Sequence, residues 1–153
     1  MPARRRTYVA LLTAVALLGL SGCQQPTPIV TVQSGGTSVH TDAGRWCFPG
    51  QSGDGCRTDA APEPAVLTVT PGQTIGVDVD KAVVERHWFV QQTQISPPPG
   101  QQAASGQSNI QDQHYFSFGT TDQPVLVQVV ALDGGSDKTR TTGVWSFVLR
   151  PRD

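Results

Sequence analysis

The chain has 153 residues, of which 15% are charged, and it contains 16 glycines and 12 prolines. This composition is typical of short strands joined by many turns, and it disfavours a helical bundle. With 11 Lys and Arg against 12 Asp and Glu, the chain has no basic excess, which argues against a nucleic-acid partner.

The first 22 residues have the layout of a secretory signal peptide. Arg4, Arg5 and Arg6 give a positive start, and residues 8–20 follow without a charge. This apolar run has 13 residues, whereas a bilayer span takes about 20, so we do not expect a permanent transmembrane helix. The Arg5-Arg6 pair also resembles a twin-arginine export signal, although paired arginines are common in Sec signals.

The tetrapeptide Leu20-Ser21-Gly22-Cys23 follows this apolar run and predicts a lipobox. A lipoprotein signal peptidase would cut before Cys23, whose acylation with two or more chains such as palmitate suffices for stable anchoring. The alternative is an ordinary secretory signal with a cysteine downstream by chance. We therefore expect a protein anchored by its lipid to the extracytoplasmic face of the cell membrane.

The mature chain is mildly acidic and keeps one pair of cysteines. Three of the 11 basic residues precede Cys23, so eight remain against 12 acidic residues, a net charge of −4 that argues against adhesion to anionic headgroups. Once Cys23 is acylated, Cys47 and Cys56 are left together in an oxidising compartment, which predicts a disulfide. Their eight intervening residues match neither a CxxC redox motif nor a short zinc knuckle.

The first part of the mature chain predicts a small hairpin unit behind a lipidated tether. Residues 23–28 are polar, and we expect them to lift the domain off the membrane. Strands are expected at residues 29–32 and 37–41, which form a hairpin around two glycines, and a third strand at 46–48 leads into the disulfide loop. This unit, residues 29–58, is too short to have its own core and should pack onto the main sandwich.

A proline-containing linker leads into the main sandwich, which we place at residues 65–150. Residues 74–80 alternate apolar and small or acidic side chains, the period of a strand buried on one face. Residues 125–132 are apolar on both faces and should lie centrally in a sheet. The full set of expected strands here is 66–69, 74–80, 86–92, 114–118, 125–132 and 144–149, with the first two forming a hairpin around Pro71-Gly72.

Strand number and spacing together predict the fold class. Eight or nine short strands indicate an all-β protein, an immunoglobulin-like β-sandwich, with residues 29–150 as a single domain. No helical periodicity is convincing in the mature chain. Residues 95–112 are mostly Gln, Ala, Ser, Gly and Pro, so we expect a flexible loop there that is either functional or disordered, with composition favouring disorder.

The order of these features resembles a family of small actinobacterial lipoproteins known only as a domain of unknown function. The resemblance covers most of the mature chain and rests on the strand at 29–32, the Cys47 and Cys56 pair, the hairpin at 66–79 and the closing strand at 144–149. It implies lipidation and a β-sandwich. It supplies no activity and no catalytic residues.

Metal and cofactor chemistry finds little support in the sequence. His40, His87 and His114 could in principle converge on zinc, but no pair has metal-ligand spacing and strand histidines are more often cross-strand partners. Asp133 and Asp137 flank a glycine turn that lacks the carboxylates and spacing of a calcium loop, which favours a simple turn. We predict no metal site and no cofactor.

The functional prediction is a non-catalytic binding or accessory module rather than an enzyme. The sequence has no G-x-S-x-G or S-x-x-K motif, and no free cysteine if Cys47 and Cys56 are bonded. Several predicted strands place aromatic side chains on both faces, so we expect an exposed aromatic patch. Its candidate residues are Trp88, Phe89 and Tyr115, which would bind a cell-envelope protein. The alternatives are a carrier of lipid or another small ligand with a cavity between the sheets, and an envelope hydrolase with spatially paired acids.

Overall fold

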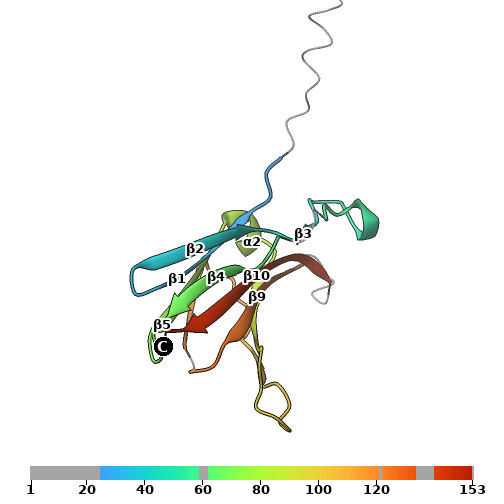
Figure 1. Cartoon of the computed structure of the whole chain (residues 1–153). Helices are drawn as coiled ribbons and strands as arrows, with labels where there is room; N and C mark the ends of the chain where they lie inside the picture. The colour runs from blue at the N-terminus through green and yellow to red at the C-terminus, as the bar shows by residue number, and fades with distance from the viewer. Residues whose placement is uncertain (1–24, 59–61, 121, 134–139, 153) are drawn as a thin grey trace, which may run out of the picture.

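The computed structural model describes residues 25–58, 62–120, 122–133 and 140–152, which form two packed β-sheets (Figure 1). The strands in these residues are β1 (Ile29–Ser34), β2 (Thr37–Asp42), β3 (Arg45–Trp46), β4 (Ala65–Val69), β5 (Thr74–Val79), β6 (Trp88–Gln94), β7 (Ser105–Gln107), β8 (Tyr115–Gly119), β9 (Val125–Leu132) and β10 (Thr141–Pro151). One sheet has the order β2-β1-β5-β8, and the other has β3-β10-β9-β6-β7 with β4 also beside β10. The predicted all-β sandwich is confirmed.

The strand pairing follows the immunoglobulin pattern. In that pattern strands A, B, E and D form one sheet, and G, F and C form the other with C′ as an addition. Here β1, β5 and β8 take the positions of A, B and E, while β10, β9, β6 and β7 take those of G, F, C and C′. Among the described residues no strand lies beyond β8, so the position of strand D is empty.

The hairpin of β1 and β2 shows why the N-terminal unit joins the sandwich. Gly35 and Gly36 have φ angles of 54° and 82°, and two successive positive φ angles belong to the type I′ turn that matches hairpin twist. Val30 and Val32 are fully buried, and β1 pairs with β5 through Val32 and Val77. The unit therefore packs onto the main sandwich, as expected from its size.

The core lies between the sheets and follows the inward residues of each strand. β9 runs between β6 and β10, which confirms its predicted central place. Two fully buried indoles have partners: Trp88 Nε1 donates to the carbonyl of Gln113 at 2.9 Å, and Trp145 Nε1 donates to that of Pro28 at 2.9 Å. These hydrogen bonds offset the cost of removing the indole N–H groups from water, so neither is left as an unsatisfied buried donor.

The hairpin expected around Pro71-Gly72 is wrong, because β4 and β5 belong to different sheets. A tight turn is present: Gln73 N–H donates to the carbonyl of Thr70 at 3.1 Å, and Gly72 has a φ of 83°. Proline followed by a residue of positive φ is typical of a type II turn, whose twist splays the flanking strands. β4 therefore crosses to pair in parallel with β10, while β5 pairs with β1 and β8.

One short helix and one short strand were not predicted from the sequence. α2 (Lys81–Val84) is a single turn that buries Val83, too short to show a helical period. β7 lies inside residues 95–112, where the sequence indicated no strand, because its three exposed residues carry no apolar pattern. Within the described part of the chain no helix is long and apolar enough to cross a membrane.

Candidate functional site

The disulfide predicted between Cys47 and Cys56 is confirmed, with a sulfur–sulfur distance of 2.04 Å. Trp46 and Arg57 flank this loop and exchange two backbone hydrogen bonds of 2.9 and 2.8 Å, so both ends of the loop are fixed to the sandwich. Cys23 and the signal peptide of residues 1–22 lie outside the described residues.

The predicted aromatic surface is wrong as a single patch. Trp88 is fully buried, since it faces the core from β6, and it cannot meet a partner. Phe89 alternates with it and is half-buried on the outer face of the same sheet. Tyr115 is 47% exposed but lies on the outer face of the other sheet, where its ring covers Gly76. Of these three residues, only Tyr115 lies beside the candidate site, because it belongs to β8, whose edge is described below.

The histidines do not come together. His114 Nδ1 lies 3.0 Å from the carbonyl of Val79, and His40 pairs across β1 with Thr31. In the residues that the structure describes, no three His, Cys, Asp or Glu side chains are placed to hold a metal ion. The turn between Asp133 and Asp137 falls largely outside the described residues.

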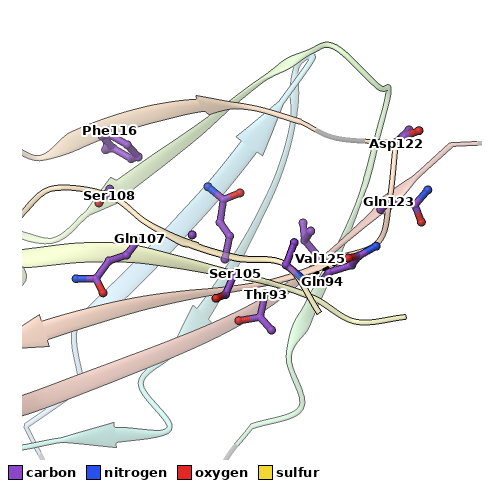
Figure 2. Close-up of a pocket in the computed structure, with 12 residues that line it drawn as sticks. Thr93, Gln94, Ser105, Gln107, Ser108, Phe116, Asp122, Gln123 and Val125 are labelled. Carbon is purple, nitrogen blue, oxygen red and sulfur yellow. Dashed lines mark hydrogen bonds between the residues drawn. The ribbon is translucent and has the colours of Figure 1, made fainter. Parts of the chain in front are cut away.

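Among the described residues, a groove of about 520 Å³ lies between β6 and β7 on one side and β8 on the other. Figure 2 shows Phe116 of β8 on one side and Thr93, Ser105 and Gln107 of the opposite sheet on the other. We call it the side groove, and its lining is Gln92, Thr93, Gln94, Ala104, Ser105, Gly106, Gln107, Ser108, Phe116, Asp122, Gln123 and Val125. Its volume is that of a ligand site.

The side groove begins where the inner face of β6 changes character. Trp88 and Val90 are buried there, and the next inward positions are Gln92 and Gln94, both half-buried. Opposite Gln92, β7 contributes Gly106, and a Cβ added to Gly106 would meet nothing within 4 Å. On the β7 side of Gln92 an open space therefore takes the place of core, while the two sheets still pack against each other through Phe118 and Leu149.

The lining is polar with a single acidic side chain, and it offers hydrogen bonds. Among the described residues neither the Gln92 nor the Gln107 side-chain amide has a hydrogen-bond partner, whereas the Ser108 hydroxyl accepts the N–H of Val90 at 3.0 Å. Asp122 is the single ionisable side chain in the lining. One carboxylate does not make the acid pair that glycoside hydrolysis uses, and inward amides are a poor surface for an acyl chain.

The edge of β8 along this groove has free backbone groups. In the described part of the chain, β8 pairs with β5 and with no other strand, and the flanking bonds are Val79 N–H to the His114 carbonyl and Thr120 N–H to the Gln73 carbonyl at 3.0 Å each. Backbone groups of an antiparallel strand alternate in direction, so Phe116 and Phe118 bond to β5. The N–H and C=O groups of the exposed residues therefore point outward, and these residues are Tyr115, Ser117 and Gly119.

Nothing in β8 protects this edge against pairing. Native proteins blunt exposed edges with charges, prolines or bulges. β8 has the sequence Tyr-Phe-Ser-Phe-Gly, which has no charge and no proline, and its register with β5 runs unbroken over five residue pairs. An edge that is open, regular and uncharged is a template for another strand.

The site can therefore bind an extended chain, with backbone pairing at β8 and a side-chain pocket in the side groove. The signal in the sequence was the period-2 continuation of β6 from Trp88 and Val90 to Gln92 and Gln94, but the strand was expected to end at residue 92. No protein-family model, curated protein or solved structure matches this chain.

Proposed function

We propose that the protein is a lipid-anchored binding module that captures an extended segment of a cell-envelope protein as an added strand on β8. The observation that carries the proposal is the open, uncharged edge formed by Tyr115, Ser117 and Gly119 beside the side groove. In strand addition the backbone bonds supply affinity and pockets for alternate side chains supply specificity.

The chemistry of the groove favours a polypeptide over the alternatives. Gln92 and Gln107 present free amides that can donate to and accept from a peptide backbone or a polar side chain, and Phe116 offers an apolar wall. A lipid carrier would instead need an apolar cavity, and the groove has inward glutamines. Glycoside hydrolysis would need a second acid beside Asp122, and no other side chain in the lining is ionisable.

Anchoring fits a weak, local binding mode. Each net hydrogen bond contributes about 0.5–1.5 kcal/mol, so a short added strand gives modest affinity. Acylation of Cys23 would hold the module beside membrane-bound partners and raise their effective concentration without a new contact. Membership of the actinobacterial lipoprotein family belongs to the same proposal.

The test is photo-crosslinking from Gln107, an exposed residue of the groove, in cells that make the full chain. Ser117→Pro removes an outward N–H from β8 without breaking a bond to β5. Ser38→Pro is its matched control: Ser38 is an exposed serine on β2, the other edge of the same sheet, and its N–H also points outward because β2 bonds to β1 through Thr37, Val39 and Thr41.

We expect a discrete polypeptide adduct whose yield falls about tenfold in Ser117→Pro, which corresponds to about 1.4 kcal/mol. Its yield should be unchanged in Ser38→Pro. Urea unfolding of both variants checks that each one folds. A glycan or lipid adduct, no adduct, or equal yields from the two proline variants would contradict the proposal.

A further inference from the structure

Residues 25–28, which precede β1, are held against the domain by hydrogen bonds. Pro28 is buried, and its carbonyl accepts the indole N–H of Trp145 at 2.9 Å. Arg57 Nη1 donates to the carbonyl of Gln25 at 3.4 Å, and Ile29 N–H donates to Asp80 Oδ2 at 2.7 Å. The described part of the tether therefore does not lift the domain, contrary to the expectation from its composition.

This attachment limits how far the domain can stand from its lipid. Cys23 lies two residues before Gln25 in the sequence. A fully extended chain spans about 3.3–3.6 Å per residue, so the two residues reach about 7 Å. An acyl chain inserted in the bilayer thus brings the surface around Gln25 to the headgroup layer, whatever the net charge of the domain.

The surface around Gln25 is one end of the sandwich. Figure 1 shows the tether at the end that carries α2 and β3, with the connection between β6 and β7 at the opposite end. The strand register agrees with this view. Trp46 of β3 pairs with Gly143 at the start of β10, whereas Val125, which lines the side groove, pairs with Leu149 near the end of β10. The two ends are therefore separated along the strands.

The tether end carries two hollows lined by side chains of both charges, with Arg86 and Arg140 beside the acidic Asp80, Glu85 and Asp133. A hollow of about 360 Å³ lies between the tether, Trp46, Phe48 and Arg86, and a second of about 480 Å³ lies between Phe48, Ser52, Arg86 and Arg140. Arg86 stacks over Trp46 with its guanidinium carbon 4.9 Å from the ring centroid. Burial lowers the pKa of Arg86, and the Asp133 carboxylate opposes this shift.

We propose that the tether end, formed by residues 25–28, the 47–57 loop and α2, rests on the lipid headgroups of the membrane that holds the Cys23 acyl chains. The side groove then opens away from the bilayer, where a partner segment can reach it. The β8 edge runs from Tyr115, which pairs with Asp78 near α2, toward the opposite end of the sandwich. This orientation depends on the lipidation that forms part of the proposed function. It adds an interaction surface that lipidation alone does not specify.

The test uses full-length acylated protein in phosphatidylcholine vesicles with a nitroxide on a fraction of the headgroups. A fluorophore is attached to one new cysteine, in either Ser52→Cys at the tether end or Gln101→Cys in the connection between β6 and β7; both positions are exposed. Cys47 and Cys56 are bonded, so the introduced thiol is the one available to the label.

We expect quenching several-fold stronger at residue 52 than at residue 101. Ten Gly and Ser residues inserted between Gln24 and Gln25 should abolish this difference while the vesicles still retain the protein. Equal quenching at the two positions, or quenching that the insertion does not change, would overturn the orientation but leave strand capture standing. Mass spectrometry of the N-terminal peptide reports acylation separately, and a Cys23 without acyl chains would overturn both the anchoring and this inference.

Discussion

Gly143→Ala should destabilise the sandwich, although replacing a strand glycine with alanine usually raises the free energy of unfolding. Gly143 has no positive φ, and such a replacement normally contributes about 0.4–1 kcal/mol through the unfolded state. A Cβ here would lie 2.7 Å from Trp46 Cε3 and 2.8 Å from Trp145 Cη2. Carbon atoms prefer about 3.5–4.0 Å, so the shortfall is close to 1 Å against two buried rings.

The unfavourable contact of the added Cβ should exceed the stabilisation that alanine gives by restricting the unfolded chain. Overpacking a well-packed core costs about 1–3 kcal/mol, and the rings of Trp46 and Trp145 already contact each other with centroids 5.7 Å apart. The Trp145 ring is also held by its bond to the Pro28 carbonyl, and the buried Trp46 ring is covered by the Arg86 guanidinium. We therefore expect a net loss of about 1–2 kcal/mol, a urea midpoint lower by about 1 M if the slope is near 1–2 kcal/mol/M.

Equilibrium unfolding in urea under non-reducing conditions measures this loss. Gly119→Ala is the matched control, since Gly119 is also in a strand with no positive φ and a Cβ there would meet nothing within 4 Å. The control should be neutral or more stable than the natural chain. A Gly143→Ala variant at least as stable as Gly119→Ala would refute the packing argument.

Three further outcomes follow from the same structure. Replacing Cys47 and Cys56 together with alanine should cost about 2–3 kcal/mol in urea unfolding, because the short loop loses its constraint on the unfolded chain; an unchanged midpoint would contradict this. Trp88→Phe should cost about 1–3 kcal/mol, since it replaces the buried indole with a smaller ring and removes the bond to Gln113, and an unchanged thermal midpoint would contradict it. Gly106→Leu should fill the side groove and reduce crosslinking from Gln107 about tenfold with little change in stability, whereas full crosslinking would show that the groove takes no part.

Local sequence patterns were enough to predict most of the strands and the β-sandwich fold. The apolar residues on both faces of β9 indicated a central strand, and consecutive glycines at 35 and 36 indicated a tight hairpin. The partner of β4 could not be predicted, because its parallel pairing joins Leu67 to Leu149 across most of the chain. A turn signal such as Pro71-Gly72 marks where the chain reverses but not which sheet it enters.

Prediction of the candidate site also required knowledge of which strands pair with each other. Trp88 and Phe89 are both aromatic, so the sequence could not say which one faces the core until the pairing of β6 was known. The inward place of Gln92 followed from the strand period, but polar side chains at the end of a strand gave no sign of a groove. The groove exists because β7 and β8 border its two sides, and β7 had no apolar pattern.

Amide hydrogen exchange at the β8 edge tests strand capture most directly. The soluble domain is measured alone and with a peptide that copies the segment crosslinked from Gln107. If the segment adds to β8, the amides of Ser117 and Gly119 exchange quickly in the free protein and become protected in the complex, while Ser38 on the opposite edge stays fast. Unchanged exchange at Ser117 and Gly119 with the peptide bound would contradict strand addition.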